Sequence, residues 1–292
     1  MTDRSSIPVL VSTDWLAGRL GDRSIRIVDA SWYLPQAGRD PGAEYRAGHI
    51  PGAVFFDLDA SSAQDSPLPH MLPDAHYFAH RMSALGLDDT ADVVVYDGSG
   101  TNLSAPRVWW MLRAFGHERT AVLDGGLAKW KREGRPLEAG EVSVAPGHFT
   151  ARLDRSRVRS LDEMRALVGS GKAQIVDLRS PGRFAAIEPE PRPGVRGGHL
   201  PGSRNLPYTE LVTPEGVVLR RDALAARIRA AGVDPARPVV ATCGSGVTAC
   251  TLVLALEHLG WHDHAVYDGS WTEWAGRTDT PVETGPAPGA SR

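Results

Sequence analysis

Four short motifs occur twice along this chain of 292 residues, and they come in the same order each time. The two copies are 144 to 150 residues apart, so small loop insertions account for the differences in spacing. The pairs are Ile27-Val28-Asp29 with Ile175-Val176-Asp177, Gly48-His49-Ile50-Pro51-Gly52 with Gly198-His199-Leu200-Pro201-Gly202, Asp97-Gly98-Ser99-Gly100 with Cys243-Gly244-Ser245-Gly246, and Asp124-Gly125-Gly126 with Asp268-Gly269-Ser270. Because each repeat has the length of a domain, the duplication predicts two similar domains rather than a solenoid.

Each half alternates short apolar runs, typical of buried strands, with amphipathic stretches of helical spacing. We expect strands at residues 25–28, 93–96, 121–123, 174–176, 239–242 and 265–267. We expect helices at residues 74–85, 105–115, 127–133, 161–168, 222–231 and 249–259. This alternation predicts an α/β fold in which each domain has a mainly parallel central sheet flanked by helices. The predicted divisions are an N-terminal domain at 1–140, a linker at 141–157, a C-terminal domain at 158–283 and a tail at 284–292.

Composition excludes several classes of protein. Hydrophobic residues make up 42% of the chain and charged residues 23%, as in soluble globular proteins. No apolar run is long enough to span a bilayer, and residues 1–6 lack the apolar stretch of a secretory signal, so we expect a cytoplasmic protein without a membrane partner. The net charge is -3 and basic residues are scattered, so we expect no nucleic-acid partner. Two cysteines are too few for a disulfide scaffold or a four-cysteine zinc site.

Cys243 directly follows a predicted strand, and ligands of open α/β sheets bind at the carboxyl ends of strands. Gly244 and Gly246 allow the backbone to curl so that successive N–H groups converge, and the next helix adds its positive end. Such a loop stabilises a thiolate or a persulfide anion. The alternative is a small buried cysteine at a strand end. The first half has Asp97 at the matching position, which favours one active and one inactive domain.

The paired motifs, with a cysteine loop in the second half and an aspartate in the first, resemble the tandem-domain rhodanese superfamily over nearly the whole chain. The resemblance implies two tandem rhodanese-like domains. Thiosulfate-specific members carry Arg and Lys directly after the cysteine, whereas this chain has Gly244 and Ser245. The run from Cys243 through Gly246 and Val247 to Thr248 is similar to the loop of the mercaptopyruvate branch, which implies that these loop residues bind substrate.

The same resemblance implies four further site residues, with Ser245 as their neighbour in the loop. Arg183 and Arg192 match two family arginines, nine residues apart, that bind the substrate's carboxylate and ketone. Asp59 and His70 match a family Asp and His that manage protons with Ser245 across the domain cleft. Without the resemblance, the arginines would be interpreted as ordinary surface residues and the histidine as a solvated loop residue.

Other polar residues of the motifs have simpler interpretations. His49 and His199 recur in both halves, including the one without the cysteine, so a structural role in a turn before a strand is expected. Asp97 is either a vestige of a lost site or an exposed carboxylate at a loop tip. Cys250 fits a small buried apolar residue better than a resolving cysteine.

The activity that the resemblance implies is transfer of sulfur from 3-mercaptopyruvate to Cys243 as a persulfide, with release of pyruvate. A thiol, a dithiol protein such as thioredoxin, or cyanide then accepts the sulfur, and no cofactor or metal is required. The alternatives are thiosulfate as donor and a sulfur carrier without turnover. A related phosphatase activity needs an arginine six positions after the cysteine, where this chain has Ala249.

Overall fold

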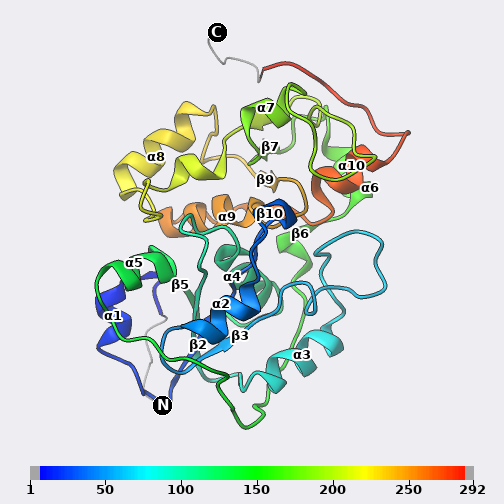
Figure 1. Ribbon diagram of the computed structural model, residues 1–292. Coiled ribbons are helices and arrows are strands. Elements are labelled where there is room, and N and C mark those ends of the chain that lie inside the picture. The colour runs from blue at the N-terminus through cyan, green and yellow to red at the C-terminus, as the bar shows by residue number, and fades with distance from the viewer. Residues whose placement is uncertain (1–6, 287–292) are drawn as a thin grey trace. The chain divides into compact units, whose positions relative to one another are not determined.

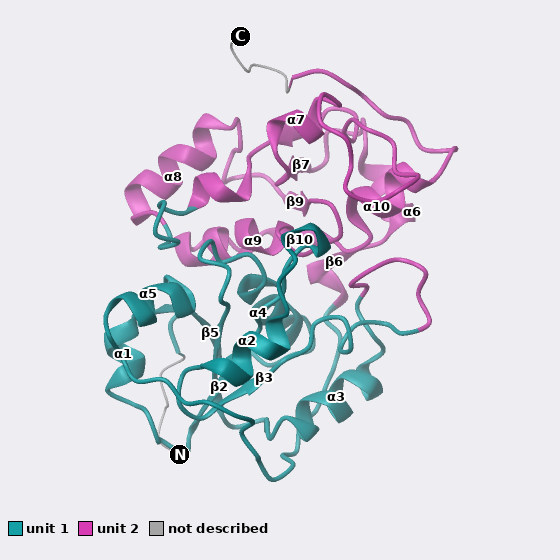
Figure 2. Ribbon diagram, viewed as in Figure 1, with its two compact units in different colours: residues 1–64, 72–154, 212–218 teal, residues 65–71, 155–211, 219–292 magenta. Residues whose placement is uncertain are grey.

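The computed structural model describes residues 7–286, drawn as a ribbon in Figure 1. Residues 1–6, and residues 287–292 of the predicted tail, lie outside the described residues. The chain forms two compact units, coloured separately in Figure 2. Unit 1 comprises residues 1–64, 72–154 and 212–218, and unit 2 comprises residues 65–71, 155–211 and 219–292. Each unit therefore contains a short segment from the other half of the sequence.

Unit 1 is built on a five-stranded sheet with the order β1-β5-β4-β2-β3, in which all neighbouring strands are parallel. Its strands are β1 Leu10–Val11, β2 Ile25–Asp29, β3 Ala53–Phe55, β4 Asp92–Tyr96 and β5 Thr120–Leu123. Its helices are α1 Thr13–Ala17, α2 Pro41–Ala47, α3 Ala75–Ala84, α4 Ala105–Ala114 and α5 Gly126–Arg132, with a 3-10 turn η1 at Pro35–Ala37. In Figure 1 α1 and α5 lie side by side, where Lys129 Nζ donates to Thr13 Oγ1.

Unit 2 repeats this topology with the sheet order β6-β10-β9-β7-β8, again parallel throughout. Its strands are β6 Val158–Arg159, β7 Gln174–Asp177, β8 Arg204–Asn205, β9 Val239–Thr242 and β10 His264–Tyr267. Its helices are α6 Leu161–Leu167, α7 Pro181–Phe184, α8 Arg221–Ala230, α9 Ala249–Leu259 and α10 Ser270–Gly276, with 3-10 turns η2 at Arg155–Arg157 and η3 at Tyr208–Leu211. The two sheets have the same strand order, so the α/β fold with two similar domains is confirmed.

The predicted strands and helices match the observed ones closely, because the central strands are buried on both faces and therefore consist of continuous apolar runs. The structure adds the edge strands β1, β3, β6 and β8, which have only two or three residues each. Segments this short carry no recognisable period, so the sequence pattern does not reveal them.

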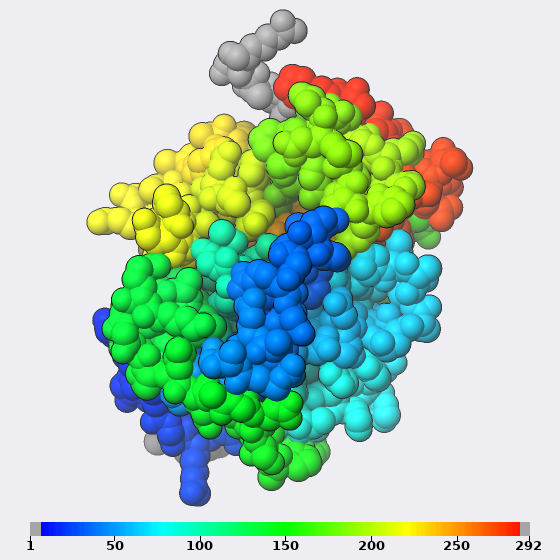
Figure 3. All heavy atoms as spheres, viewed as in Figure 1, coloured from blue at the N-terminus to red at the C-terminus, as the bar shows by residue number. Residues whose placement is uncertain are grey.

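Each unit has its own apolar core. In unit 1 the core includes Val94, Tyr96 and Trp130, and in unit 2 it includes Val240, Trp271 and Trp274. On the face of unit 1 shown in Figure 3, the blue segment containing α2 lies beside the green segment after α5. Among residues 7–286, no helix combines the length and the apolar character needed to cross a bilayer.

His49 and His199 have equivalent buried positions in the two units. The ring of His49 stacks on Tyr45 and its Nδ1 lies 2.8 Å from the Tyr45 carbonyl oxygen. The ring of His199 stacks on Phe184 and its Nδ1 lies 2.9 Å from the Phe184 carbonyl oxygen. Each histidine ties a helix end to the turn before a short strand, as the prediction of a structural role requires.

Candidate active site

The loop of Cys243 connects β9 to α9, and α10 holds its backbone from one side. The Cys243 N–H donates to Ser270 Oγ at 3.2 Å, and the Cys243 carbonyl accepts from the Trp271 N–H at 3.0 Å. The Gly244 carbonyl accepts from the N–H and the hydroxyl of Thr272, at 2.9 and 2.6 Å. The first two carbonyl oxygens of the loop therefore point toward α10.

The second part of the loop leads directly into α9. Gly246 has a φ of 76°, which a residue with a side chain rarely adopts, and this turn brings Val247 and Thr248 to the start of the helix. The Cys250 thiol donates to the Gly246 carbonyl at 3.3 Å, so this second cysteine supports the loop from within. Because the loop of Cys243 leads directly into α9, the partial positive charge of the helix N-terminus favours an anion in the loop.

The equivalent loop of unit 1 shows where such an anion is held. Asp97 occupies the position of Cys243, and its carboxylate accepts N–H groups of Ser99, Ser104 and Ala105 at 2.8 to 3.0 Å. Ala105 is the first residue of α4, as Ala249 is of α9. Asp97 is only 1% exposed, so the alternative of an exposed carboxylate at a loop tip is wrong. In this loop, backbone N–H groups converge on a negative charge at the first position.

His70 belongs to unit 2, through the segment 65–71, and it contacts the cysteine loop. Its Nδ1 lies 2.9 Å from Ser245 Oγ, and Arg192 Nη2 donates to the same oxygen at 3.4 Å. His70 is buried and has a φ of 61°, in the left-handed region. Strained backbone of this kind is concentrated at functional sites. His70, Ser245 and Arg192 thus lie together within hydrogen-bonding distance.

The segment 212–218 has the corresponding place in unit 1. There the Asn102 amide donates to the Gly216 carbonyl at 2.9 Å, and the Val218 N–H donates to Asp124 Oδ1 at 2.8 Å. Gly216 has a φ of 78°. Residues 65–71 in unit 2 and residues 212–218 in unit 1 therefore each place one left-handed residue at the loop that follows the central strand of the unit. In unit 1 that residue is a glycine, whereas in unit 2 it is a histidine.

Arg183 is placed by the start of α7, where Ser180 caps the helix and Pro181 occupies its first position. A Cβ atom added to Gly244 would lie 3.0 Å from Arg183 Nη2 and 3.9 Å from Arg192 Nη1. The absence of a side chain at Gly244 therefore leaves room for both guanidinium groups beside the cysteine loop.

Two residues that the sequence reasoning did not assign stand behind Arg183. Glu190 accepts from Arg183 Nε at 3.2 Å and Nη2 at 2.6 Å, and from Arg179 Nη1 at 2.7 Å. Arg179 also pairs with Asp177 and lies over the Trp271 ring, with 4.5 Å to its centroid. Burial alone would lower the pKa of Arg179, but the charges of Asp177 and Glu190 raise it above its ordinary value. Glu190 lies two positions before Arg192, and its place between Pro189 and Pro191 was the available signal.

Asp59 lies in unit 1, where its carboxylate accepts from Trp32 Nε1 at 3.2 Å. His70 lies in unit 2, and so do all the other predicted site residues. Within residues 7–286, no cluster of three or more His, Cys, Asp or Glu side chains could hold a metal ion.

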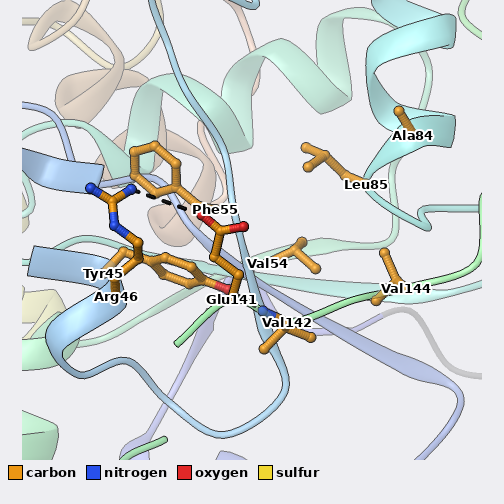
Figure 4. A pocket seen from close by; sticks show the side chains of 9 residues that line it. All are labelled: Tyr45, Arg46, Val54, Phe55, Ala84, Leu85, Glu141, Val142 and Val144. Carbon is orange, nitrogen blue, oxygen red and sulfur yellow. Dashed lines mark hydrogen bonds and ion pairs between the residues drawn. The ribbon is translucent and has the colours of Figure 1, made fainter. Parts of the chain in front are cut away.

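Unit 1 also contains a cavity of about 250 Å³, shown in Figure 4. Its apolar lining includes Val54, Leu85 and Val144, and at its edge Arg46 Nη1 lies 4.0 Å from Glu141 Oε1. The lining contains no predicted site residue and no thiol. This hollow is therefore separate from the chemistry of the cysteine loop.

This chain is similar to a known domain family and to several known proteins. The family model of the rhodanese-like domain matches the chain twice, at residues 12–133 and 160–277. The chain is 46% identical to the 3-mercaptopyruvate sulfurtransferase of Escherichia coli K12 over 94% of this chain and 97% of that protein. It is 44% identical to the 3-mercaptopyruvate sulfurtransferase of Homo sapiens over 91% of each chain. The crystal structure of SseA from Escherichia coli, a 3-mercaptopyruvate sulfotransferase, superposes with a TM-score of 0.83 at 43% identity, over 91% of this chain and 99% of that one.

Proposed function

Because the chain belongs to the rhodanese family, we propose that it is a sulfurtransferase that takes sulfur from 3-mercaptopyruvate onto Cys243 and releases pyruvate. The observation that carries the proposal is the Cys243 loop, with the Ser245 hydroxyl contacted by His70 and Arg192. The nucleophile precedes Ser245 by two residues, and the Ser245 hydroxyl is contacted by a group that can move a proton and by a cation for a carboxylate. The names of relatives that match more than nine-tenths of the chain support the choice of donor.

Substrate binding is assigned to Arg183 and Arg192. Guanidinium groups bind carboxylates through paired N–H donors, and 3-mercaptopyruvate has a carboxylate and a ketone side by side. Gly244 supports this assignment, because a side chain at that position would meet Arg183. Gly246, Val247 and Thr248 complete the wall of the site with their backbone.

In the chemical step, the Cys243 thiolate attacks the sulfur of 3-mercaptopyruvate. A sulfur–sulfur bond forms and the carbon–sulfur bond breaks, with its electron pair passing to the carbon as the enolate of pyruvate. The proton of the substrate thiol is transferred to that carbon, by way of His70 and Ser245, with Asp59 orienting His70. The products are pyruvate and a Cys243 persulfide anion, so atoms and charge balance without a cofactor or a metal.

The persulfide is stabilised as Asp97 is stabilised in unit 1. The Asp97 carboxylate accepts three backbone N–H groups, and the proposal gives the outer sulfur on Cys243 the same environment. A thiol, a dithiol protein such as thioredoxin, or cyanide then removes the sulfur, which makes the cycle ping-pong. We place this reaction in the cytoplasm.

Intact-protein mass spectrometry after incubation with 3-mercaptopyruvate alone tests the proposal. We expect a single added sulfur on the wild-type protein and on Cys250→Ser, and none on Cys243→Ser. Cys250 is the matched control because it is the other cysteine of the chain. No adduct on the wild-type protein, or an adduct that persists in Cys243→Ser, would contradict the proposed function.

A further inference from the structure

A row of alternating charges lies behind Arg183, and the proposed reaction does not use it. Asp177, Arg179, Glu190 and Arg183 follow one another in alternating sign, and each contacts the next. The first three side chains are at most 4% exposed, whereas Arg183 is 19% exposed. This row of charges therefore begins in the interior of unit 2 and ends at the cysteine loop.

Glu190 is the member that determines how Arg183 is presented. Its carboxylate receives two donors of the Arg183 guanidinium, Nε and Nη2, which fixes the plane of that group. It is itself anchored by Arg179, which is held by Asp177 and by the Gly198 carbonyl at 2.7 Å. A long side chain that would otherwise sample several rotamers is thus oriented before substrate arrives.

Glu190 also changes the charge that the substrate meets. Two carboxylates and two guanidinium groups sum to zero formal charge, so Arg183 reaches the loop as half of an ion pair. A monoanion such as 3-mercaptopyruvate needs directed N–H donors, which Arg183 retains in this arrangement. A dianion such as thiosulfate needs positive charge that is not already compensated, because two charges must be removed from water.

The geometry points to Glu190 as a positioning and specificity-determining residue, which orients Arg183 for a carboxylate and disfavours dianionic sulfur donors. The inference rests on the proposed function, because it concerns the donor that the same site accepts. Glu190 acts through Arg183 and contacts no reacting atom.

The test measures kcat and KM with 3-mercaptopyruvate and with thiosulfate for Glu190→Gln. We expect KM for 3-mercaptopyruvate to rise about tenfold or more, with a much smaller change in kcat, because charge-assisted bonds to Arg183 are lost. We expect kcat/KM for thiosulfate to stay the same or rise. Equal losses for both donors, or an unchanged KM for 3-mercaptopyruvate, would overturn the inference.

Two comparisons separate a specific role from a general effect on folding. Glu141→Gln is the matched control, because Glu141 is an exposed acid of unit 1 that pairs with Arg46 at 4.0 Å and contacts no residue of the row of charges, and its kinetics should match the wild type. In an Arg183→Ala background, Glu190→Gln should raise KM by less than about threefold, since its effect passes through Arg183. A full additional effect in that background would contradict the inference.

If Glu190→Gln does not fold, Glu190→Asp decides, because it keeps the charge beside Arg179 but no longer reaches Arg183 fully. A raised KM for 3-mercaptopyruvate supports the inference and an unchanged KM overturns it. Calorimetry with pyruvate, which has the carboxylate and the ketone but no sulfur, tests the role of Glu190 separately from the proposed function. Weaker pyruvate binding by the variant supports the role of Glu190 even if the wild-type protein forms no persulfide. Equal binding by variant and wild type overturns that role and leaves the proposed function untouched.

Discussion

At the scale of single residues, backbone strain marks the two loops where the halves differ. Within residues 7–286, the non-glycine residues with positive φ are His70, Asn102, Ala186 and Ser270. His70 and Ser270 contact the Cys243 loop, Asn102 lies in the Asp97 loop, and Ala186 lies between Arg183 and Glu190. Such conformations cost about 1–2 kcal/mol each for residues with a Cβ atom. At His70, Asn102 and Ser270 the side chain makes a hydrogen bond that a glycine could not make.

Substitutions of Ser270 measure the cost of a left-handed backbone in a residue that has a Cβ atom. It has a φ of 50°, its hydroxyl accepts from the Cys243 N–H and donates to the Tyr267 carbonyl, and the equivalent residue in unit 1 is Gly126. We expect Ser270→Ala to be less stable than Ser270→Gly by about 1 kcal/mol, because both variants lose the hydroxyl and only glycine relieves the backbone strain. Urea denaturation measures the difference.

Ser24 is the control for this comparison. It lies in a turn outside the left-handed region, so there the alanine variant should be the more stable of the pair. If alanine is also the better replacement at Ser270, the strained backbone of that position is not a cost to folding, and the prediction is wrong.

At the scale of secondary-structure elements, one design serves two purposes. A parallel strand, a tight loop and a helix N-terminus form a site for negative charge in both units. In unit 1 a built-in carboxylate, Asp97, occupies the site and gives the loop its shape. In unit 2 the same position holds Cys243, which in the proposed cycle carries its negative charge first as a thiolate and then as a persulfide. The anion site of unit 1 is thus filled by the chain itself, without a substrate.

Asp97→Asn tests the structural role of that carboxylate. The variant keeps the shape of the side chain but presents an amide to backbone N–H groups that need an acceptor. We expect the free energy of unfolding to fall by about 1.5–3 kcal/mol, the range for hydrogen bonds to a charged group. Asp57→Asn is the control, because Asp57 is exposed and accepts the Ala60 N–H, and it should change stability by no more than about 0.5 kcal/mol. Equal effects of the two substitutions would show that burial of Asp97 carries no special weight.

At the scale of the whole molecule, the duplication gives two sheets of identical strand order whose surroundings have diverged. A buried histidine of unit 1 makes the stability of the folded protein depend on pH. His117, between α4 and β5 of unit 1, is 5% exposed, and its Nε2 lies 3.1 Å from the Ala91 carbonyl oxygen. Burial lowers the pKa of His117 below its ordinary value of 6.5. The unfolded chain therefore takes up a proton more readily than the folded chain.

The sign of the resulting pH dependence follows from this difference. The contribution of neutral His117 to stability is fully present above pH 6.5 and is lost as the pH falls below that value. We expect His117→Gln, which keeps a donor for Ala91 but does not titrate, to show a shallower loss of stability between pH 7 and pH 5. Thermal unfolding across this range measures it. The exposed His76, changed to Gln, should leave the wild-type slope unaltered, and a similar slope in all three proteins would rule out His117 as the source.

Much of the architecture could be predicted before the tertiary structure was known. The central strands β4 and β9 and the helices α4 and α9 have local signatures, because an apolar run or a helical period is written in neighbouring residues. The place of Cys243 after a central strand follows from the same patterns. The two-residue edge strands do not, because their pairing depends on the sheet beside them.

The sequence by itself determined the duplication, the α/β class of both halves, and the contrast between Cys243 and Asp97 in otherwise matching loops. Only the tertiary structure decided that Asp97 is buried among N–H donors and that Glu190 joins Arg179 to Arg183. It also placed His70 on Ser245, which is 175 positions away in the chain. The physical reason is that hydrogen bonds and ion pairs of this kind depend on the path of the folded backbone, whereas strands and helices depend on the residues within them.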